Sequence, residues 1–308
     1  MTQVLTPQPT SPEFSCLTFD DRIAALRARK MEQTRDKQQV IGAMDYDDWA
    51  MVLPPADRRQ LVQSISGSGM PINDVLLTGV ELLSNHEDGS FYGPELCGAN
   101  FRRLLNSHPP YVDAMSSLAG AYMTNFGSYR ASGWKPEFAV PDDLAELRQR
   151  YQLVGAIGAG QHFCQDLGIG LQLGLGGLQA KIEDHRQQNT QPAQQEFYRG
   201  LTHVIAGMQE WIAAGAACAR NMAMTETQPQ LRQNLTEVAQ INERLVTAAP
   251  VTFRQACQWI LWYQTAARMY NGSGSLGRLD ELLMPFYVRE HGDGTLRDEE
   301  AIYHLASL

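Results

Sequence analysis

No apolar run in this sequence is long enough to span a bilayer, because Arg, Gln, Asp or several Gly interrupt each one. Positive charge is also scarce: 25 Lys and Arg stand against 34 Asp and Glu, for a formal net charge of -9. Without a run of basic residues, the chain lacks the electrostatic footprint that binding to a nucleic acid requires. We therefore expect a globular protein with neither a membrane nor a nucleic acid as its partner.

Cysteine is rare as well, and no Cys-x-x-Cys pair occurs. The five cysteines are widely scattered: Cys16, Cys97, Cys164, Cys218 and Cys257. An odd number of dispersed cysteines is typical of reduced thiols rather than of a disulfide framework. The N-terminus also carries no basic stretch that leads into an apolar segment, as a secretory signal would. These features predict a cytoplasmic protein.

The 308 residues, of which 44% are hydrophobic, are enough to bury a sizeable core. Residues 1–13 are polar and rich in proline, which predicts a disordered tail before a structured part that begins at Phe14. Alternating charges predict a helix with a solvated face over 20–36. Prolines and glycines recur through 45–74 and 76–106, where we expect short, irregular segments.

Long helices dominate the second half of the chain, because apolar residues recur there at steps of three and four. Pro229 suits the first turn of a helix, and Thr252 and Gln255 have the spacing of a capping box. The predicted helices cover 192–224, the stretch from Pro229 to the stop at Pro250, 252–271, and a stretch that begins near Arg297.

A glycine-rich stretch from Gly155 to Gly177 invites comparison with nucleotide-binding loops. Gly168, Gly170 and Gly174 approximate a dinucleotide fingerprint with one residue too many. No buried strand is evident before them and no Lys-Ser/Thr pair follows, so a phosphate cradle is disfavoured. The simpler interpretation is that the last glycines of this stretch let one element pack closely against another backbone.

Three residues of types that bind metals lie in the same stretch. His162, Cys164 and Asp166 occupy alternate positions, so on a strand all three would face the same side. No second group of metal ligands is visible in the sequence. A metal-dependent enzyme therefore stays an alternative to a satisfied polar cluster or a substrate pocket.

The loop from Asn271 to Asp280 is the most unusual segment, because it interleaves polar residues with three glycines directly after a helix. Its polar residues are Asn271, Ser273, Ser275, Arg278 and Asp280. Polar side chains on a glycine-rich turn beside a packed scaffold are what a small-molecule pocket needs. The alternative is an Arg278–Asp280 pair that merely fixes a buried turn.

The run from Pro250 to Tyr287 resembles the glycyl radical enzymes of the pyruvate formate-lyase superfamily. In the lyase and dehydratase branch of that family, this helix is followed by a Ser-x-Ser-x-x-Arg-x-Asp loop and a Pro-aromatic-Tyr end. The matching residues here are Ser273, Ser275, Arg278, Asp280, Pro285, Phe286 and Tyr287. Upstream, His162, Asp166 and Gly174 have the spacing that recurs in the same branch. The resemblance covers roughly residues 20 to 308.

The resemblance implies an α/β fold in which two half-barrels of parallel strands are wrapped by helices, with the active site buried at their centre. Residues 14–308 would form the N-terminal portion of such a domain, half of a ten-stranded barrel with a helix-rich exterior. The implied activity is that of an anaerobic radical lyase, dehydratase or formate acetyltransferase-like enzyme on a small organic substrate. In this family an activating enzyme with S-adenosylmethionine and an iron–sulfur cluster installs a glycyl radical, which oxidises a cysteine that attacks the substrate.

The chain departs from the family where the radical residues are expected. It contains no Arg-Val-x-Gly-Tyr box, and none of its cysteines stands in a Gly-Cys-x-Glu or Cys-Cys pattern. We therefore expect no catalytic radical residue, no bound cofactor and no activity from these 308 residues alone. An alternative function is a non-catalytic binding or scaffold half-protein that pairs with a separate C-terminal half.

The resemblance also implies which residues bind the substrate. These are His162, Asp166, Asn271, Ser273 and Ser275, while Arg278 and Asp280 brace the loop. No residue is expected to bind a metal. The implied partners are a small-molecule substrate, the radical-installing activating enzyme and a second copy of the chain in a homodimer.

Overall fold

The computed structural model describes residues 17–41, 82–87, 89, 91–107, 110–120, 142–152, 163–271 and 274–308. The elements in chain order are α1 (Phe19–Ile41), α4 (Pro94–Ser107), α5 (Asp142–Arg150), β1 (Phe163–Cys164), α6 (Leu167–Gln188), α7 (Pro192–Thr225), α8 (Pro229–Leu245), α9 (Phe253–Asn271), β2 (Gly274–Ser275), α10 (Leu279–Gly292) and α11 (Asp298–Ser307). The predicted tail over 1–13 and the predicted irregular segment over 45–74 lie outside this part of the chain.

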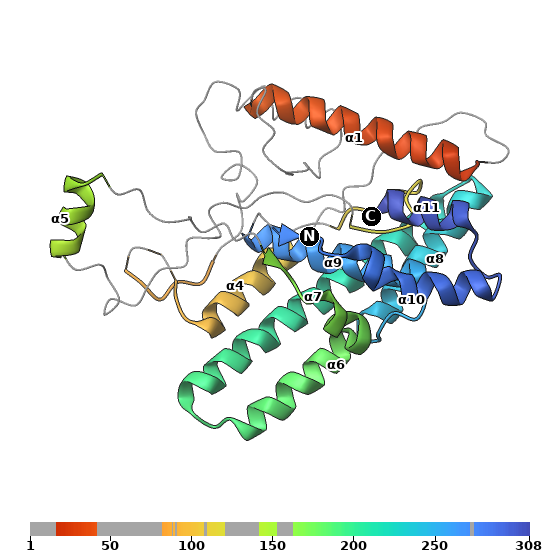
Figure 1. Ribbon diagram of the computed structural model, residues 1–308. Coiled ribbons are helices and arrows are strands. Elements are labelled where there is room, and N and C mark those ends of the chain that lie inside the picture. The colour runs from red at the N-terminus through yellow and green to blue at the C-terminus, as the bar shows by residue number, and fades with distance from the viewer. Residues whose placement is uncertain are drawn as a thin grey trace.

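Helices make up most of the structure (Figure 1). The strands within the described ranges are β1 and β2, which pair in parallel. The helix-rich exterior is therefore present, while the ten-stranded half-barrel stays a prediction. Among the helices named above, none is both long enough and apolar enough to cross a membrane.

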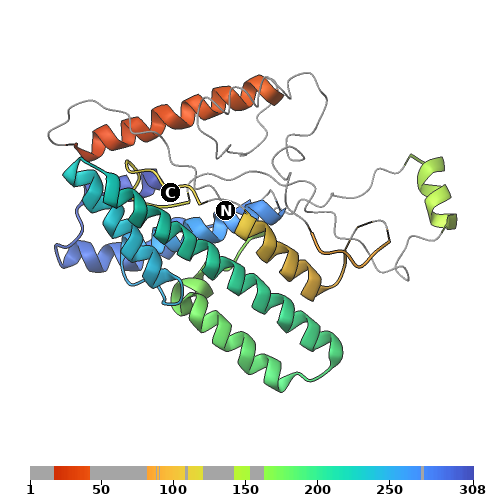
Figure 2. The same ribbon diagram turned by 180° about the vertical axis from the view of Figure 1, so that it is seen from behind.

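Helix α7 organises the larger part of the fold and packs against α4, α6 and α8. Residues 189–191 connect it to α6, so that the two helices lie side by side as an antiparallel pair (Figures 1 and 2). Pro192 and Pro229 stand in the first turns of α7 and α8, where a missing N–H costs no hydrogen bond. The predicted helices over 192–224 and from Pro229 are confirmed.

Helices α4 and α7 cross at two glycines, Gly98 and Gly200. A Cβ atom added to Gly98 would lie 2.2 Å from the carbonyl oxygen of Gly200, and one added to Gly200 would lie 2.3 Å from that of Pro94. Only a hydrogen at each position lets the two backbones meet this closely. The prediction of irregular structure over 76–106 is therefore wrong from Pro94 onward, because Gly98 serves helix packing rather than a turn.

Glycines also join α6 to the connection between α8 and α9. The Gly176 N–H donates to the carbonyl of Thr247 at 2.8 Å, and a Cβ on Gly174 would lie 2.5 Å from backbone atoms of Ala248 and Ala249. Gly174 has a φ of 62°, a conformation that residues with a side chain rarely adopt. The interpretation of these two glycines as close-packing positions is confirmed.

Helix α9 lies between two apolar cores. Its fully buried Trp262 packs edge-to-face on Trp211 of α7, with 4.7 Å between ring centroids, in the first core. Trp259, also buried, belongs to the second core together with apolar residues of α10 and α11. The position of α9 is therefore fixed from both sides.

Of the two hydrogen bonds that define the predicted capping box at the start of α9, one is present. The Gln255 N–H donates to the Thr252 hydroxyl at 3.2 Å, whereas the Gln255 side chain accepts a hydrogen bond from the N–H of Val251. Helix α9 ends at Asn271 and α11 begins at Asp298, as the sequence predicts.

A polar network fixes the segment 111–120 to the helices. The side-chain amide of Gln258 accepts from the Ala119 N–H and donates to the Ala119 carbonyl, both at 2.8 Å. Arg254, one turn earlier on α9, donates to the carbonyl of Ser117 at 3.0 Å. Asn234 of α8 donates to two further carbonyls of this segment. Side chains of α8 and α9 thus satisfy several backbone groups of this buried segment.

His304 of α11 is buried beside charged groups. Its side chain is 3% exposed, and within the described part of the chain its Nδ1 has no hydrogen-bond partner. Glu300 lies 3.8 Å from its Nε2. Burial, and then the charges of Arg254 and Arg22, lower the pKa of His304 to about 3. The fold therefore favours the neutral imidazole.

This burial predicts acid sensitivity with a defined origin. In the unfolded chain the pKa of His304 is about 6.5, so its contribution to stability is fully present above that pH and is lost as the pH falls toward 3. Between pH 7.5 and pH 5 the free energy of unfolding should fall by about 2 kcal/mol more in the wild type than in a His304→Gln variant. Urea denaturation at both pH values measures the difference, and an equal fall in both proteins would refute the assignment.

Candidate functional site

The parallel ladder joins two segments that are far apart in the sequence. Its register pairs Phe163 with Gly274 and Cys164 with Ser275. In Figure 1 the two strands are the arrows drawn beside α9. One segment adjoins the predicted pair His162 and Asp166, and the other belongs to the predicted polar loop over 271–280. The backbone therefore brings together the two stretches that the sequence selects.

Asp166 lies just beyond the end of β1 and caps helix α6. Its Oδ1 accepts a hydrogen bond from the Ile169 N–H at 3.3 Å, and its side chain is exposed. The expectation that Asp166 shares a strand face with Cys164 is wrong, because the strand ends at Cys164 and the chain then turns into a helix. The carboxylate instead stands at the N-terminus of α6, where the helix dipole stabilises negative charge.

Gln165, between β1 and Asp166, holds an acceptor that the described part of the chain leaves unpaired. Its Oε1 atom is buried and has no hydrogen-bond partner there. A buried acceptor without a donor costs about 1–3 kcal/mol, so each one in a native protein calls for an explanation such as a ligand. Sequence reasoning missed Gln165, and its place between two candidate residues is the signal that could have marked it.

Arg278 and Asp280 form an ion pair at the start of α10, where Arg278 is the N-cap and Asp280 lies in the first turn. The guanidinium donates to both carboxylate oxygens, at 2.9 and 2.7 Å, and also lies 3.1 Å from Glu281. The Arg278 hydrogen bond lowers the pKa of Asp280 to about 2. The pair is 68% and 61% exposed, so the alternative of a buried turn is wrong, although the predicted pair itself exists.

The remaining predicted contacts are placed only in part. His162 and Ser273 lie outside the described ranges. Asn271 ends α9 and Ser275 stands in β2, so their backbones are placed and their side chains are not. Their roles in binding a substrate stay predictions.

Two aromatic residues of α9 stack on each other near the start of α6. The Trp259 and Tyr263 rings are stacked with 5.2 Å between centroids. The Trp259 ring also packs against the first turn of α6, where a Cβ atom on Gly170 would lie 1.9 Å from the ring. Burial, and then the charge of Asp166, raise the pKa of Tyr263. The sequence motifs did not include Tyr263, and its position one turn after Trp259 was the available signal.

The cysteines whose side chains the structure describes are unsuited to act as nucleophiles. Burial raises the pKa of Cys218 to about 11 and of Cys257 to about 12, and it also raises that of Cys97. Such thiols stay protonated at neutral pH and are poor nucleophiles. No group of three His, Cys, Asp or Glu that could hold a metal ion occurs among the described residues, which exclude His162.

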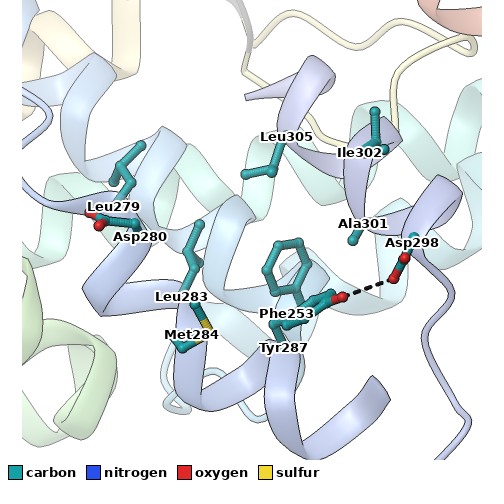
Figure 3. A pocket seen from close by; sticks show the side chains of 10 residues that line it. All are labelled: Phe253, Leu279, Asp280, Leu283, Met284, Tyr287, Asp298, Ala301, Ile302 and Leu305. Atoms are coloured by element: carbon teal, nitrogen blue, oxygen red, sulfur yellow. Dashed lines mark hydrogen bonds between the residues drawn. The ribbon is translucent and has the colours of Figure 1, made fainter. Parts of the chain in front are cut away.

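A cavity of about 490 Å³ lies between α10 and α11 (Figure 3). Its lining is Phe253, Leu279, Asp280, Leu283, Met284, Tyr287, Asp298, Ala301, Ile302 and Leu305. Tyr287 donates to Asp298 at 2.8 Å, and Asp280 pairs with Arg278. Because each of these polar groups already has a partner, this apolar groove offers little to orient a polar substrate. The candidate site is therefore at the ladder.

The sequence profile described as pyruvate formate lyase-like matches residues 142–308, more than half of the chain. The chain belongs to this family. The predicted resemblance of the chain to the glycyl radical enzymes of the pyruvate formate-lyase superfamily is thereby confirmed. The matched range runs from α5 to α11 and includes both strands of the ladder.

Curated members of the family share part of this sequence. The chain is 31% identical to the probable dehydratase YbiW of Escherichia coli (strain K12) over 47% of this chain and 19% of that protein. It is 31% identical to the 4-hydroxyphenylacetate decarboxylase glycyl radical subunit of Clostridioides difficile (strain CD196), over 34% of this chain and 12% of that protein. The matches thus span less than a fifth of these relatives' length.

Solved structures of glycyl radical enzymes share the fold. A glycyl radical enzyme from Archaeoglobus fulgidus aligns with a TM-score of 0.60 and 17% identity, over 76% of this chain and 37% of that one. The B12-independent glycerol dehydratase from Clostridium butyricum aligns with a TM-score of 0.58 and 14% identity, over 97% of this chain and 41% of that one. The helices and the ladder are therefore part of a pyruvate formate-lyase type fold.

Proposed function

We propose that this chain forms part of the substrate pocket of an anaerobic glycyl radical lyase or dehydratase that acts on a small organic molecule. The observation that carries the proposal is the ladder, which sets the stretch ending at Asp166 beside the polar loop that contains Ser275. Family membership supports it, because the relatives named above include a probable dehydratase and a decarboxylase subunit.

In this pocket the chain's own residues bind and orient the substrate. Asp166 offers a carboxylate at the exit of β1, and Gln165 offers the buried acceptor that the described protein leaves unpaired. The residues proposed for the remaining polar contacts are His162, Asn271, Ser273 and Ser275. A His162–Asp166 pair could hold and move a proton during a dehydration. The Arg278–Asp280 pair braces the loop from outside.

The radical chemistry comes from residues that these 308 positions do not include. A glycyl radical, installed by an activating enzyme with S-adenosylmethionine and an iron–sulfur cluster, supplies hydrogen abstraction from the bound substrate. This chain contributes the walls that exclude water and fix the substrate in place.

The Asp166→Asn substitution tests the pocket without disturbing the fold. Asn caps a helix as well as Asp does, so the free energy of unfolding should stay within about 0.5 kcal/mol of the wild type. Loss of the carboxylate should lower kcat/KM of the anaerobically activated gene product by about 100-fold or more. The matched Asp166→Ala variant should in addition lose about 1 kcal/mol of stability with the cap. Wild-type turnover in the Asn variant would refute the role of Asp166.

A non-catalytic scaffold function is the second candidate. The chain would then pair with a separate C-terminal half. Sequencing the DNA beyond codon 308 separates the two candidates. Continuation into both motifs, in frame or after one frameshift, favours the pocket, and unrelated sequence favours the scaffold.

We also propose that the protein forms a homodimer. Apolar side chains that a monomer leaves exposed on α10 and α11 support this: Met284, Val288 and Ile302 are 50–59% exposed. Apolar side chains exposed in this way are typical of a surface that contacts another protein.

A further inference from the structure

The groove between α10 and α11 is a cavity that the proposed substrate pocket does not use. Its volume of about 490 Å³ lies within the range of small-molecule sites. Eight of its ten lining residues are apolar or aromatic, and the other two are Asp280 and Asp298. Such walls offer little to a small polar substrate, but they favour a ligand with a mostly apolar body.

The two carboxylates of the lining differ in how their charge is compensated. Figure 3 shows them on opposite sides of the groove. Asp280 accepts two hydrogen bonds from the Arg278 guanidinium, at 2.9 and 2.7 Å, which balances its charge. Asp298 instead accepts from the Tyr287 hydroxyl at 2.8 Å and lies 3.2 Å from Nε2 of His291. A phenol and a neutral imidazole bind a carboxylate without cancelling its charge.

The cations that follow in the sequence near Asp298 are engaged elsewhere and do not line the cavity. Arg289 pairs with Glu290 at 3.2 Å, and Arg297 lies 3.8 Å from Glu299. Tyr287 and His291 both approach Oδ1 of Asp298, so that within the described part of the chain Oδ2 is left to accept from a ligand. This end of the groove therefore attracts a positive charge.

Aromatic rings stand beside the same carboxylate. Tyr287 packs edge-to-face on Phe253, with 6.2 Å between ring centroids, and stacks on His291 with 5.2 Å between centroids. Phe253 and Tyr287 line the cavity next to its apolar part (Figure 3). Because aromatic faces attract cations, the rings and the carboxylate favour the same kind of charged group. The Tyr287 hydroxyl also holds the carboxylate in place.

We propose that this groove is a binding site for a small apolar amine. The apolar body of the ligand lies between α10 and α11 against Leu283 and Ile302, and its ammonium group pairs with Asp298 beside the Tyr287 ring. The proposal is carried by the cavity, its lining and the charge at one end. It is independent of the radical chemistry proposed for the complete enzyme.

Hexylamine, hexanol and hexanoate test the proposal, because they share an apolar body and differ in the charge of the head group. Calorimetric titration of the 308-residue chain measures their affinities. We expect hexylamine to bind about 3- to 10-fold more tightly than hexanol, and hexanoate to bind more weakly than both. Added salt should narrow the difference between amine and alcohol. Equal affinities for the amine and the alcohol would overturn the proposal.

Three variants separate the head group from the apolar body. Asp298→Asn should lower the affinity for hexylamine by about 3- to 10-fold and leave hexanol unchanged. Ile302→Ser should weaken both ligands by a similar factor, because it removes part of the apolar wall at a residue that is 58% exposed.

Glu299→Gln is the matched control. Glu299 neighbours Asp298 on α11 and is 70% exposed, but it does not line the cavity. Its variant should bind both ligands as the wild type does, with all variants equally stable in urea. An equal loss of amine binding in Asp298→Asn and Glu299→Gln would show a general effect of net charge and would contradict the site.

Two other occupants of the groove are distinguished by the same titrations. Hexylamine binding that weakens as the protein concentration rises would show that a second copy fills the groove. Binding that is present in the 308-residue chain but absent from the complete gene product would show that another part of the enzyme covers it. Either result overturns the proposal. Because the titrations need neither radical nor turnover, failure of the proposed function leaves this inference intact.

Discussion

Replacing Arg254 with methionine is expected to lower the free energy of unfolding by about 3 kcal/mol, as measured by urea denaturation. The Arg254 side chain is 14% exposed and makes three polar contacts. Nε donates to the Ser117 carbonyl at 3.0 Å, Nη1 pairs with Glu237 at 2.6 Å, and Nη2 donates to the Asn234 amide oxygen at 2.9 Å. Methionine keeps the apolar stem but leaves these acceptors without a donor.

Arg220→Met is the control for this prediction. Arg220 pairs with Glu243 across α7 and α8, but the two side chains are 51% and 47% exposed, so its loss should cost no more than about 1 kcal/mol. Equal losses in the two variants would refute the account of a network that fixes the segment 111–120. Arg254→Met should also reduce the acid sensitivity assigned to His304, because the Arg254 charge contributes to its lowered pKa.

A Gly98→Ala variant is expected to lose about 3 kcal/mol of stability, although alanine is the better helix former. The gain in helix propensity is about 1 kcal/mol. It is outweighed because the new methyl group would lie 2.2 Å from the backbone oxygen of Gly200, and neither helix can move without leaving the core. Urea denaturation gives the size of the loss, and near-ultraviolet circular dichroism of the Trp211–Trp262 pair reports the displacement of α7.

Gly292→Ala provides the matched control on another helix. A Cβ at Gly292, the last residue of α10, would meet no atom within 4 Å. We expect its stability to be unchanged or raised by up to about 1 kcal/mol. If Gly98→Ala were as stable as Gly292→Ala, the close crossing of α4 and α7 would be wrong.

Helices α7, α8, α9 and α11 could be predicted from the sequence because their signals are local. Three local signals predict α7 and α8. They are the spacing of apolar residues at steps of three and four, the prolines Pro192 and Pro229 in the first turns, and the helix stop before Pro250. Helix α4 could not be predicted in the same way, because Gly98 serves a contact with Gly200 that exists only after folding. A glycine carries the same local signal whether it breaks a helix or packs one.

The same distinction between local and long-range signals applies to the candidate site. The polar loop and the His162–Asp166 stretch could be identified by composition and by resemblance, since the family motif is local. Their pairing could not, because strands as short as β1 and β2 show no period, and packing elsewhere in the molecule fixes their register. Tyr263 and Gln165 belong to no motif and became visible only through their neighbours in space.

The most direct test of the central claim is an EPR measurement on the complete gene product, isolated without oxygen and incubated with an activating enzyme, S-adenosylmethionine and a reductant. The account predicts the doublet of a glycyl radical in that sample, and none in the 308-residue chain treated alone. A complete, activated product without the doublet would contradict the assignment of this chain to a working glycyl radical enzyme.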